Sequence, residues 1–236
     1  MCKMKKIDDV LLLNEENLAL AAQAEIDTVS DVIKEFRVLM QMYSAGISVV
    51  KTKLETLDEE FRAKYDYNPI HHIKSRLKEP RSIFEKMRRL GIPPTLGGMK
   101  AGLTDIAGVR VVCNYIQDAE MIAELLLSQE DVSLIKKTDY IHEPKESGYR
   151  SLHIVIEVPI FLSDRMERVP VEIQIRTIAM DCWATLEHHL GYKRAGILPK
   201  ELRYRLKICA MAIAEVDEEM QEIKREIERL RPDSMP

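Results

Sequence analysis

Two long runs of apolar residues with helical spacing enclose a middle segment whose apolar residues alternate instead. In both runs the apolar positions follow one another at steps of three and four, which predicts a long helix at each end of the chain. The N-terminal run consists of Ile26, Val29, Ile33, Phe36, Met40, Tyr43, Ile47, Val50, Leu54, Leu57 and Phe61. The C-terminal run consists of Leu202, Leu206, Cys209, Ile213, Val216, Met220, Ile223, Ile227 and Leu230.

The apolar stripe on each predicted helix has two interpretations. It covers a core face of the same chain, or it forms an interface with a second copy, because a stripe of 3.5-residue period is the coiled-coil form of amphipathicity. Pro199 stands where a first-turn proline fits the C-terminal helix, and Pro232 follows its end. Neither stripe contains an Asn or Lys that would specify a parallel pair, so antiparallel packing is favoured.

Four short segments between these helices have the composition of strands, namely 107–114, 132–136, 151–158 and 169–176. Residues 117–127 and 179–190 are predicted to be helical. We therefore expect an α/β (α+β) fold, a mixed sheet with helices on its faces, flanked by the two long helices. The expected parts are an N-terminal helical segment (1–65), a sheet-containing domain (66–195) and a C-terminal helix (196–236), all in one compact unit.

The last predicted strand carries chemical groups on one of its faces. Its apolar residues occupy every second position from Val169 to Ile175, and the positions between them include Glu172, Gln174 and Arg176. This polar face either lines a hydrated functional site or is an ordinary solvent-exposed surface of the sheet. The pattern alone leaves both possibilities open.

Composition restricts the class of protein. The 236 residues include 35 basic and 39 acidic side chains, and the net charge of −4 argues against a general nucleic-acid binder. The four cysteines lack zinc-site spacing and are expected to be reduced thiols. The N-terminal apolar run is too short for a signal-peptide core, and no apolar stretch approaches the length of a membrane span. We expect a soluble, cytoplasmic protein.

A basic segment runs from His71 to Leu90. It holds seven Lys and Arg residues against two Glu, a local charge of +5 in an acidic chain. Such a cluster suits a polyphosphate, although a solvated helix face has the same composition. Residues 82–90 are predicted to form a helix with Ser82 as its N-cap, whose free N–H groups would also face phosphate.

Asp105 stands just before the first predicted strand, and Arg110 lies five residues further on. One or two carboxylates next to phosphate oxygens are what a phosphate-bound Mg²⁺ requires, although an Asp here also suits a turn. Glu172 is the second candidate carboxylate if its strand lies next to that of Asp105.

A loop with Lys145, Gly148, Tyr149 and Arg150 precedes the third predicted strand, near whose start His153 lies. A glycine beside an aromatic ring, among cationic side chains, is typical of a loop that stacks a base and holds its phosphates. The alternative is a plain connecting loop in which the tyrosine packs locally.

Several ordered blocks resemble the RelA/SpoT synthetase family. The blocks are TDIAGVRVVC (104–113), KESGY (145–149) with Arg150 and His153, VEIQIRT (171–177) and WATLEH (183–188). The resemblance covers about residues 65–195, and the size of the chain and its HIKSRLK block are similar to those of stand-alone, RelP-type small alarmone synthetases. The chain contains no His-Asp dipeptide, so the resemblance does not extend to the family's hydrolase domain.

This resemblance implies a nucleotidyltransferase-like fold and a defined reaction. The β,γ-pyrophosphate of ATP moves to the 3′-hydroxyl of GTP or GDP, AMP is released, and the stringent-response alarmone (p)ppGpp forms. The implied cofactor is Mg²⁺, and the implied assembly is a homotetramer without a membrane or stable nucleic-acid partner.

The resemblance also assigns roles to the candidate residues. Asp105 matches the Mg²⁺ ligand, and Glu172 matches the carboxylate that completes the metal site or accepts the proton of the attacking hydroxyl. Tyr149 matches the tyrosine that stacks on guanine. The matches on the ATP side are Arg76, Lys78, Ser82, Lys86 and Arg110. Of these, Arg110 matches an arginine that stacks on adenine. The matches on the GTP or GDP side, besides Tyr149, are Lys145, His153, Gln174 and Asp181.

Asp181 departs from relatives that carry Asn at this place. Its carboxylate would still accept hydrogen bonds from N1–H and N2 of guanine, whereas adenine offers an acceptor at N1.

Two other functions stay open at this point. One is a nucleotidyltransferase-fold enzyme with a different acceptor, although the Gly-Ser and Asp-x-Asp pattern typical of such enzymes is missing. The other is a catalytically silent nucleotide or RNA sensor that oligomerises through its helices.

Overall fold

The computed structural model describes residues 4–192 and 198–230 and divides the chain into two compact units, Met1–Met42 and Tyr43–Pro236. The boundary falls inside helix α1 (Met4–Lys64), which contributes to both units. Pro232 and the side chains of Ile26 and Val29 lie outside what the structure describes. Within the described ranges, every helix is too short or too polar to span a bilayer.

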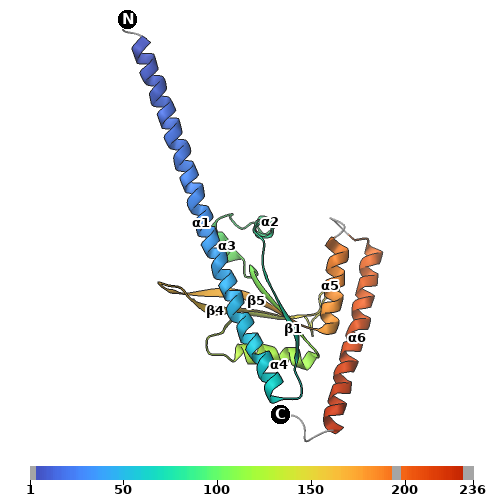
Figure 1. Cartoon of the computed structure of the whole chain (residues 1–236). Coiled ribbons are helices and arrows are strands. Elements are labelled where there is room, and N and C mark those ends of the chain that lie inside the picture. Colours follow the sequence, from blue (N-terminus) through green and yellow to red (C-terminus); the bar gives the residue numbers. More distant parts are fainter. Residues whose placement is uncertain (1–3, 193–197, 231–236) are drawn as a thin grey trace. The chain divides into compact units, whose positions relative to one another are not determined.

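The second unit is built on a five-stranded mixed sheet with the order β1-β2-β5-β4-β3. Its strands are β1 (Ile70–Leu77), β2 (Ala107–Cys113), β3 (Ser133–Asp139), β4 (Leu152–Phe161) and β5 (Met166–Thr177). Figure 1 labels three of these strands, β1, β4 and β5. Strands β2 and β5 are parallel, and the other neighbouring pairs are antiparallel. The predicted mixed sheet is confirmed, and its four predicted strands are present with shifted ends.

Strand β1 and the short helix α3 (Leu96–Gly102) were not predicted from the sequence. Strand β1 reads IHHIKSRL, in which polar and charged residues interrupt any apolar alternation, so the sequence lacks the usual strand pattern. It is a strand because it pairs along most of its length with the apolar strand β2. The remaining helices are α2 (Pro80–Leu90), α4 (Ile116–Leu127), α5 (Ile178–Tyr192) and α6 (Lys200–Leu230).

The apolar face of β5 packs against the part of α1 that belongs to the second unit. A side chain at Gly46 of α1 would lie 3.0 Å from Val169 and 3.2 Å from Val171, so glycine permits close approach of helix and strand. Tyr43, Ile47, Val50 and Leu54 of the predicted N-terminal stripe are buried. For these positions the stripe covers a core face, whereas Ile33, further toward the N-terminus, is 51% exposed.

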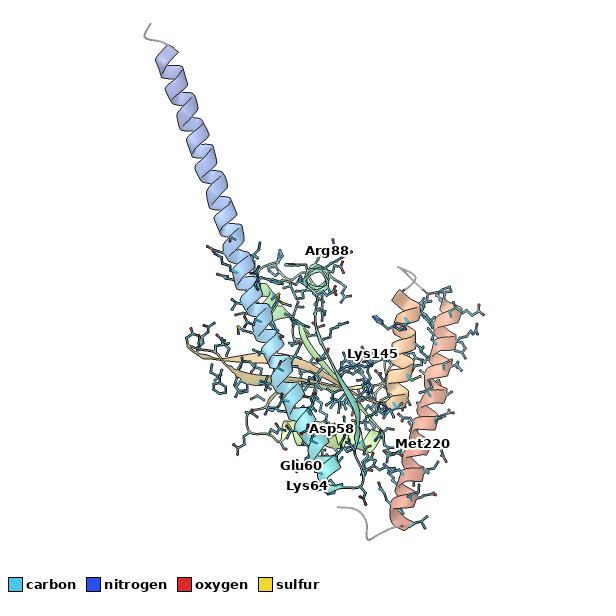
Figure 2. All side chains as sticks on the ribbon, in the orientation of Figure 1. Asp58, Glu60, Lys64, Arg88, Lys145 and Met220 are labelled. Carbon is cyan, nitrogen blue, oxygen red and sulfur yellow. The ribbon has the colours of Figure 1, made fainter. Side chains whose placement is uncertain are left out.

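Helix α6 has the opposite arrangement. Its buried residues are Ala210, Asp217 and Gln221, and its predicted apolar stripe lies largely on the outside of the single chain. Val216, Met220, Ile223, Ile227 and Leu230 are all at least 41% exposed, and Figure 2 labels Met220 on this helix. From Val216 to Leu230 the stripe therefore does not cover the core of its own chain, whereas Leu206 and Ile213 pack against the cluster of Trp183, Ala184 and Ala210.

Candidate active site

The polar face of the sheet consists of side chains from neighbouring strands that share a register. Because directly paired residues point to the same side of a sheet, the pairings of Lys74 with Arg110, Arg110 with Gln174, and Gln174 with His153 form one polar row. The next row runs from Arg76 through Gly108 to Glu172. Because β2 pairs with β5, the strand of Glu172 lies next to the strand that follows Asp105, which is the condition under which Glu172 was the second candidate carboxylate.

Asp105 precedes β2 and is surrounded by ammonium groups. Its Oδ2 accepts hydrogen bonds from Lys78 and, at 2.6 Å, from Lys86. Burial opposes ionisation of the Asp105 carboxyl, but the two lysines outweigh burial and hold its pKa below the ordinary value. Its buried Oδ1 has no hydrogen-bond partner among the described residues. An ionised carboxylate with one oxygen available is the result.

Glu172 is ionised for a similar reason. Burial alone would raise the pKa of Glu172, and the charge of Asp105 acts in the same direction. The imidazole of His153, whose Nδ1 is 3.6 Å from Oε1, and the amide of Gln174, which donates to Oε2 at 3.1 Å, outweigh these effects and lower the pKa. Two ionised carboxylates therefore meet here, one just before β2 and one in the adjacent strand β5.

Tyr149 is held at the other end of the polar face. Its hydroxyl lies 2.8 Å from Nε2 of His153 and accepts a hydrogen bond of 2.7 Å from Nη2 of Arg176. The ammonium of Lys145 lies over its ring at 4.8 Å from the centroid and over the ring of Tyr140 at 4.6 Å. Figure 2 labels Lys145 near α5. The tyrosine has local contacts, but its ring is also half-buried in a cation-rich setting that suits a nucleotide base.

The loop that carries Tyr149 turns sharply before it. The N–H of Gly148 donates to the carbonyl of Lys145 at 2.8 Å, and the N–H of Lys145 donates to the carbonyl of Tyr149 at 3.1 Å. Gly148 has φ +90°, a conformation that residues with a side chain rarely adopt. Glycine is therefore required at this turn.

Asp181 lies in the first turn of α5 and binds two guanidinium groups. Its Oδ1 accepts from Arg110 at 3.2 Å and from Arg176 at 3.0 Å. Arg176 is 4% exposed and also donates to Gln174 at 2.9 Å. Arg176 thereby connects Asp181, Gln174 and Tyr149.

Two cavities adjoin these residues. One of about 610 Å³ contains six of the predicted residues in its wall, together with Arg176, Lys74, Glu187, His188 and His189. Those six are Arg76, Asp105, Arg110, Tyr149, Glu172 and Gln174. The other, of about 520 Å³, is lined by Lys78, Ser82, Glu85, Lys86, Arg88 and Arg89. Lys145, His153 and Asp181 contact Tyr149, Glu172 and Arg176 of the wall of the larger cavity, respectively.

The predicted N-cap role of Ser82 is wrong. Helix α2 begins at Pro80, and its N-cap residue is Glu79, which makes no side-chain cap hydrogen bond. Proline is suited to the first helical position because it lacks the N–H group that would be unpaired there, so the helix starts two residues earlier than predicted. Ser82 instead faces the smaller cavity.

The donor set fits a magnesium ion. Magnesium is bound in proteins through one or two carboxylates, with substrate phosphates and water completing the shell. Asp105 supplies a buried carboxylate oxygen without a partner, and Glu172 supplies a second carboxylate from the adjacent strand. No group of three or more acidic, His or Cys side chains within the described residues forms a metal site by itself, so phosphate oxygens are needed as well.

Comparison with known proteins identifies the family. Residues 75–197 match the region found in RelA/SpoT proteins. The chain belongs to the RelA/SpoT family. It is 40% identical to the GTP pyrophosphokinase YwaC of Bacillus subtilis over 86% of this chain and 97% of that one, and 37% identical to the GTP pyrophosphokinase YjbM of the same organism over 83% and 91%.

Solved structures agree with this membership. The small alarmone synthetase 1 of Bacillus subtilis, bound to its product pppGpp, superposes with a TM-score of 0.77 at 38% identity, covering 82% of this chain and 98% of that one. The small alarmone synthetase 2 of the same organism gives a TM-score of 0.72 at 41% identity, over 79% and 97%. This RelA/SpoT chain is thus a small alarmone synthetase of the RelP type, as the sequence indicated.

Sequence reasoning did not single out Arg176 as a site residue of this RelA/SpoT chain. It lies on the predicted polar face of β5 and within the VEIQIRT block, so the alternation that identified Glu172 also contained it. Its near-complete burial and its three partners become visible only in the structure.

We predict that Arg176→Lys destabilises the fold more than Arg110→Lys does. Lysine cannot reproduce the planar set of donors that reaches Asp181, Gln174 and Tyr149, and the lost buried bonds are expected to cost about 2–3 kcal/mol in the free energy of unfolding. Arg110 shares Asp181 but is 36% exposed, so its replacement should cost less than about 1 kcal/mol. Urea unfolding of both variants measures the difference, and equal losses would contradict the central role of Arg176.

Proposed function

We propose that Asp105, Glu172 and the cations around them transfer the β,γ-pyrophosphate of ATP to the 3′-hydroxyl of GDP or GTP. As a small alarmone synthetase the chain is a GTP pyrophosphokinase, which forms (p)ppGpp and releases AMP in stringent-response signalling. The residue assignment rests on one observation: two ionised carboxylates, Asp105 just before β2 and Glu172 in the adjacent strand β5, lie between a lysine cluster (Lys78 and Lys86) and the loop that carries Tyr149.

The lysine cluster is the proposed ATP side. Lys78 and Lys86 bind Asp105 and also line the smaller cavity with Ser82, while Arg76 and Arg110 line the larger one. Triphosphate oxygens entering between the cavities would take over hydrogen bonds that the two lysines now make to Asp105. Positively charged donors fixed around the transferring phosphorus stabilise the charge of the transition state, which is the main task in phosphoryl-type transfer.

Magnesium is the proposed cofactor. Asp105 and Glu172 would hold it together with ATP oxygens, and the bound ion neutralises phosphate charge. When Lys78 and Lys86 turn from Asp105 to the phosphates of ATP, the Asp105 carboxylate would become free to bind the magnesium ion.

The Tyr149 loop is the proposed acceptor side. Guanine would stack on the Tyr149 ring after Lys145 leaves it, and Lys145 would then bind the acceptor phosphates together with His153. Arg176 keeps the tyrosine hydroxyl fixed, and Gln174 and Asp181 are proposed to lie on the guanosine side of the same polar face.

Glu172 is the proposed acceptor of the proton from the 3′-hydroxyl. The acceptor oxygen forms a bond to the β-phosphorus of ATP, and the bond from that phosphorus to the oxygen bridging it to the α-phosphorus breaks, so AMP leaves with the bridging oxygen. The lowered pKa makes Glu172 ionised at neutral pH but a weak base. It therefore takes the proton when bond formation to phosphorus has made the hydroxyl acidic.

The proposal is tested by incubating the protein with Mg²⁺ and ATP together with GDP, GTP or no acceptor, and resolving the nucleotides. A guanosine product carrying two additional phosphates, together with AMP and dependent on the acceptor, is expected. ATP turnover that is indifferent to guanine nucleotides would contradict it.

We predict that Glu172→Gln abolishes synthesis and leaves the fold intact. The amide keeps the size of the side chain but cannot accept the proton, and loss of a general base costs about 10²-fold or more. Steady-state rates and a thermal unfolding curve measure both properties. Product formation above about a tenth of the wild-type rate would refute the assigned role.

We predict that Tyr149→Ala weakens binding of GDP far more than binding of ATP. Loss of base stacking is expected to cost about 1–3 kcal/mol on the acceptor side only. Separate titrations with GDP and with a non-hydrolysable ATP analogue measure the two affinities. Equal losses for both would mean that Tyr149 merely shapes the loop.

We also propose a homotetramer in which the exposed stripe of α6 takes part in the interface. The double variant Met220→Glu/Ile227→Glu should lower the mass measured by light scattering at micromolar concentration, because it buries two charges in an apolar contact. Met220→Leu/Ile227→Leu is the matched control and should retain the wild-type mass. A monomeric wild-type protein would refute the tetramer, and an unchanged mass of the Glu variant would place the interface elsewhere.

A further inference from the structure

Helix α6 contacts α5 and the loop that carries Tyr149, through residues to which no catalytic part has been assigned. Figure 1 shows α5 and α6 side by side, and the indole N–H of Trp183 in α5 donates to the carbonyl of Leu206 in α6 at 3.0 Å. Trp183, Ala184 and Ala210 form a small core on which Tyr149 packs. The tyrosine proposed to stack on guanine thus rests partly on α6.

The backbone of the Tyr149 loop fits closely against α6. A side-chain carbon at Gly148 would lie 2.5 Å from the Cβ of Ala210 and 3.7 Å from the carbonyl oxygen of Lys207. Because close-packed surfaces cannot shift independently, displacement of this part of α6 would move the turn at Gly148.

An ion pair connects the C-terminal end of the Tyr149 loop to α6. Arg150 follows Tyr149 directly, and its Nη1 donates to Oε1 of Glu218 in α6 at 2.7 Å. The Arg150 side chain is 22% exposed and that of Glu218 is 58% exposed. The ion pair therefore links Arg150 to α6, and its partial exposure to solvent makes it an interaction of moderate strength.

A third contact reaches the start of α5. The hydroxyl of Thr177 accepts a hydrogen bond from the N–H of Met180, as an N-cap residue does, and donates to Oδ2 of Asp217 at 2.6 Å. Asp217 is 6% exposed. Since Asp181 lies in the same first turn, α6 also fixes the helix end that carries a proposed acceptor residue.

We propose that α6 is a positioning element for the acceptor nucleotide and that Glu218, acting through Arg150, is a positioning residue for the Tyr149 loop. The inference rests on the proposed function, because it assumes that this loop binds the guanine nucleotide. It predicts that changes at Glu218 weaken binding of the guanine nucleotide and leave binding of ATP unchanged. Within the described residues, no hydrogen bond or ion pair joins α6 to Arg76, Lys78 or Lys86 on the ATP side.

Trp183 provides the readout, since it is the single tryptophan of the chain and packs in the same cluster as Tyr149. GDP is titrated against the wild-type protein, Glu218→Ala and Glu218→Arg, and tryptophan fluorescence is followed. A non-hydrolysable ATP analogue is titrated in parallel. Glu222→Ala is the matched control, because Glu222 also pairs with arginines of α6, at 3.2 Å from Arg225, but does not reach the loop.

The positioning role predicts that Glu218→Ala raises the Kd for GDP about two- to fivefold, as for a partly exposed ion pair. Glu218→Arg should have a larger effect because it opposes two like charges, and the exchange Arg150→Glu/Glu218→Arg should restore much of the affinity. The Kd for the ATP analogue, the unfolding temperature and the Glu222→Ala control should stay close to wild type.

Three outcomes would overturn the inference. An unchanged Kd for GDP in both Glu218 variants, with a wild-type protein that binds GDP, would remove the positioning role and leave the proposed function intact. Equal weakening of GDP and ATP-analogue binding together with a lower unfolding temperature would make Glu218 a structural residue only. A wild-type protein that binds no guanine nucleotide would refute the proposed function and with it this inference.

Discussion

The parallel pairing of β2 with β5 is the constraint on which the site depends. It sets Glu172 directly across from Gly108, three residues after Asp105, so that two carboxylates from distant parts of the sequence reach one polar face. Two carboxylates this close would raise each other's pKa if they were isolated. Lys78 and Lys86 on one side, and His153 and Gln174 on the other, keep both ionised. Gly108 has no side chain, so the row between Arg76 and Glu172 stays open as part of the cavity wall.

Much of this site was predictable because its signature is local. Strict alternation identified β5 and its Glu172–Gln174–Arg176 face, and the position of Asp105 before an apolar strand identified the second carboxylate. Strand β1 was missed because it owes its conformation to pairing with β2, which a single sequence does not display. The start of α2 was misplaced because Ser82 has a strong capping preference, but the proline at position 80 had already begun the helix.

The two terminal helices illustrate a different limit of sequence reasoning. Their apolar spacing is nearly identical, yet in α1 the positions from Tyr43 to Leu54 are buried, whereas in α6 most of the stripe is exposed. Helix α6 packs through Ala210 and through polar residues such as Asp217 and Gln221, each of which is buried with a hydrogen-bond partner. Periodicity shows that a helix has an apolar face, but the partner of that face depends on tertiary contacts that periodicity does not contain.

We propose that Asp105 exchanges its lysine partners for a divalent cation when ATP binds. Binding of Mn²⁺ in the presence of a non-hydrolysable ATP analogue, followed by electron paramagnetic resonance, tests it most directly. Asp105→Asn should weaken the protein-bound Mn²⁺ at least about tenfold, because the amide leaves Lys78 and Lys86 to repel the ion. Asp131→Asn, which removes a carboxylate paired with Lys53 elsewhere in the chain, should bind Mn²⁺ as the wild type does. Unchanged Mn²⁺ binding by Asp105→Asn would contradict the account.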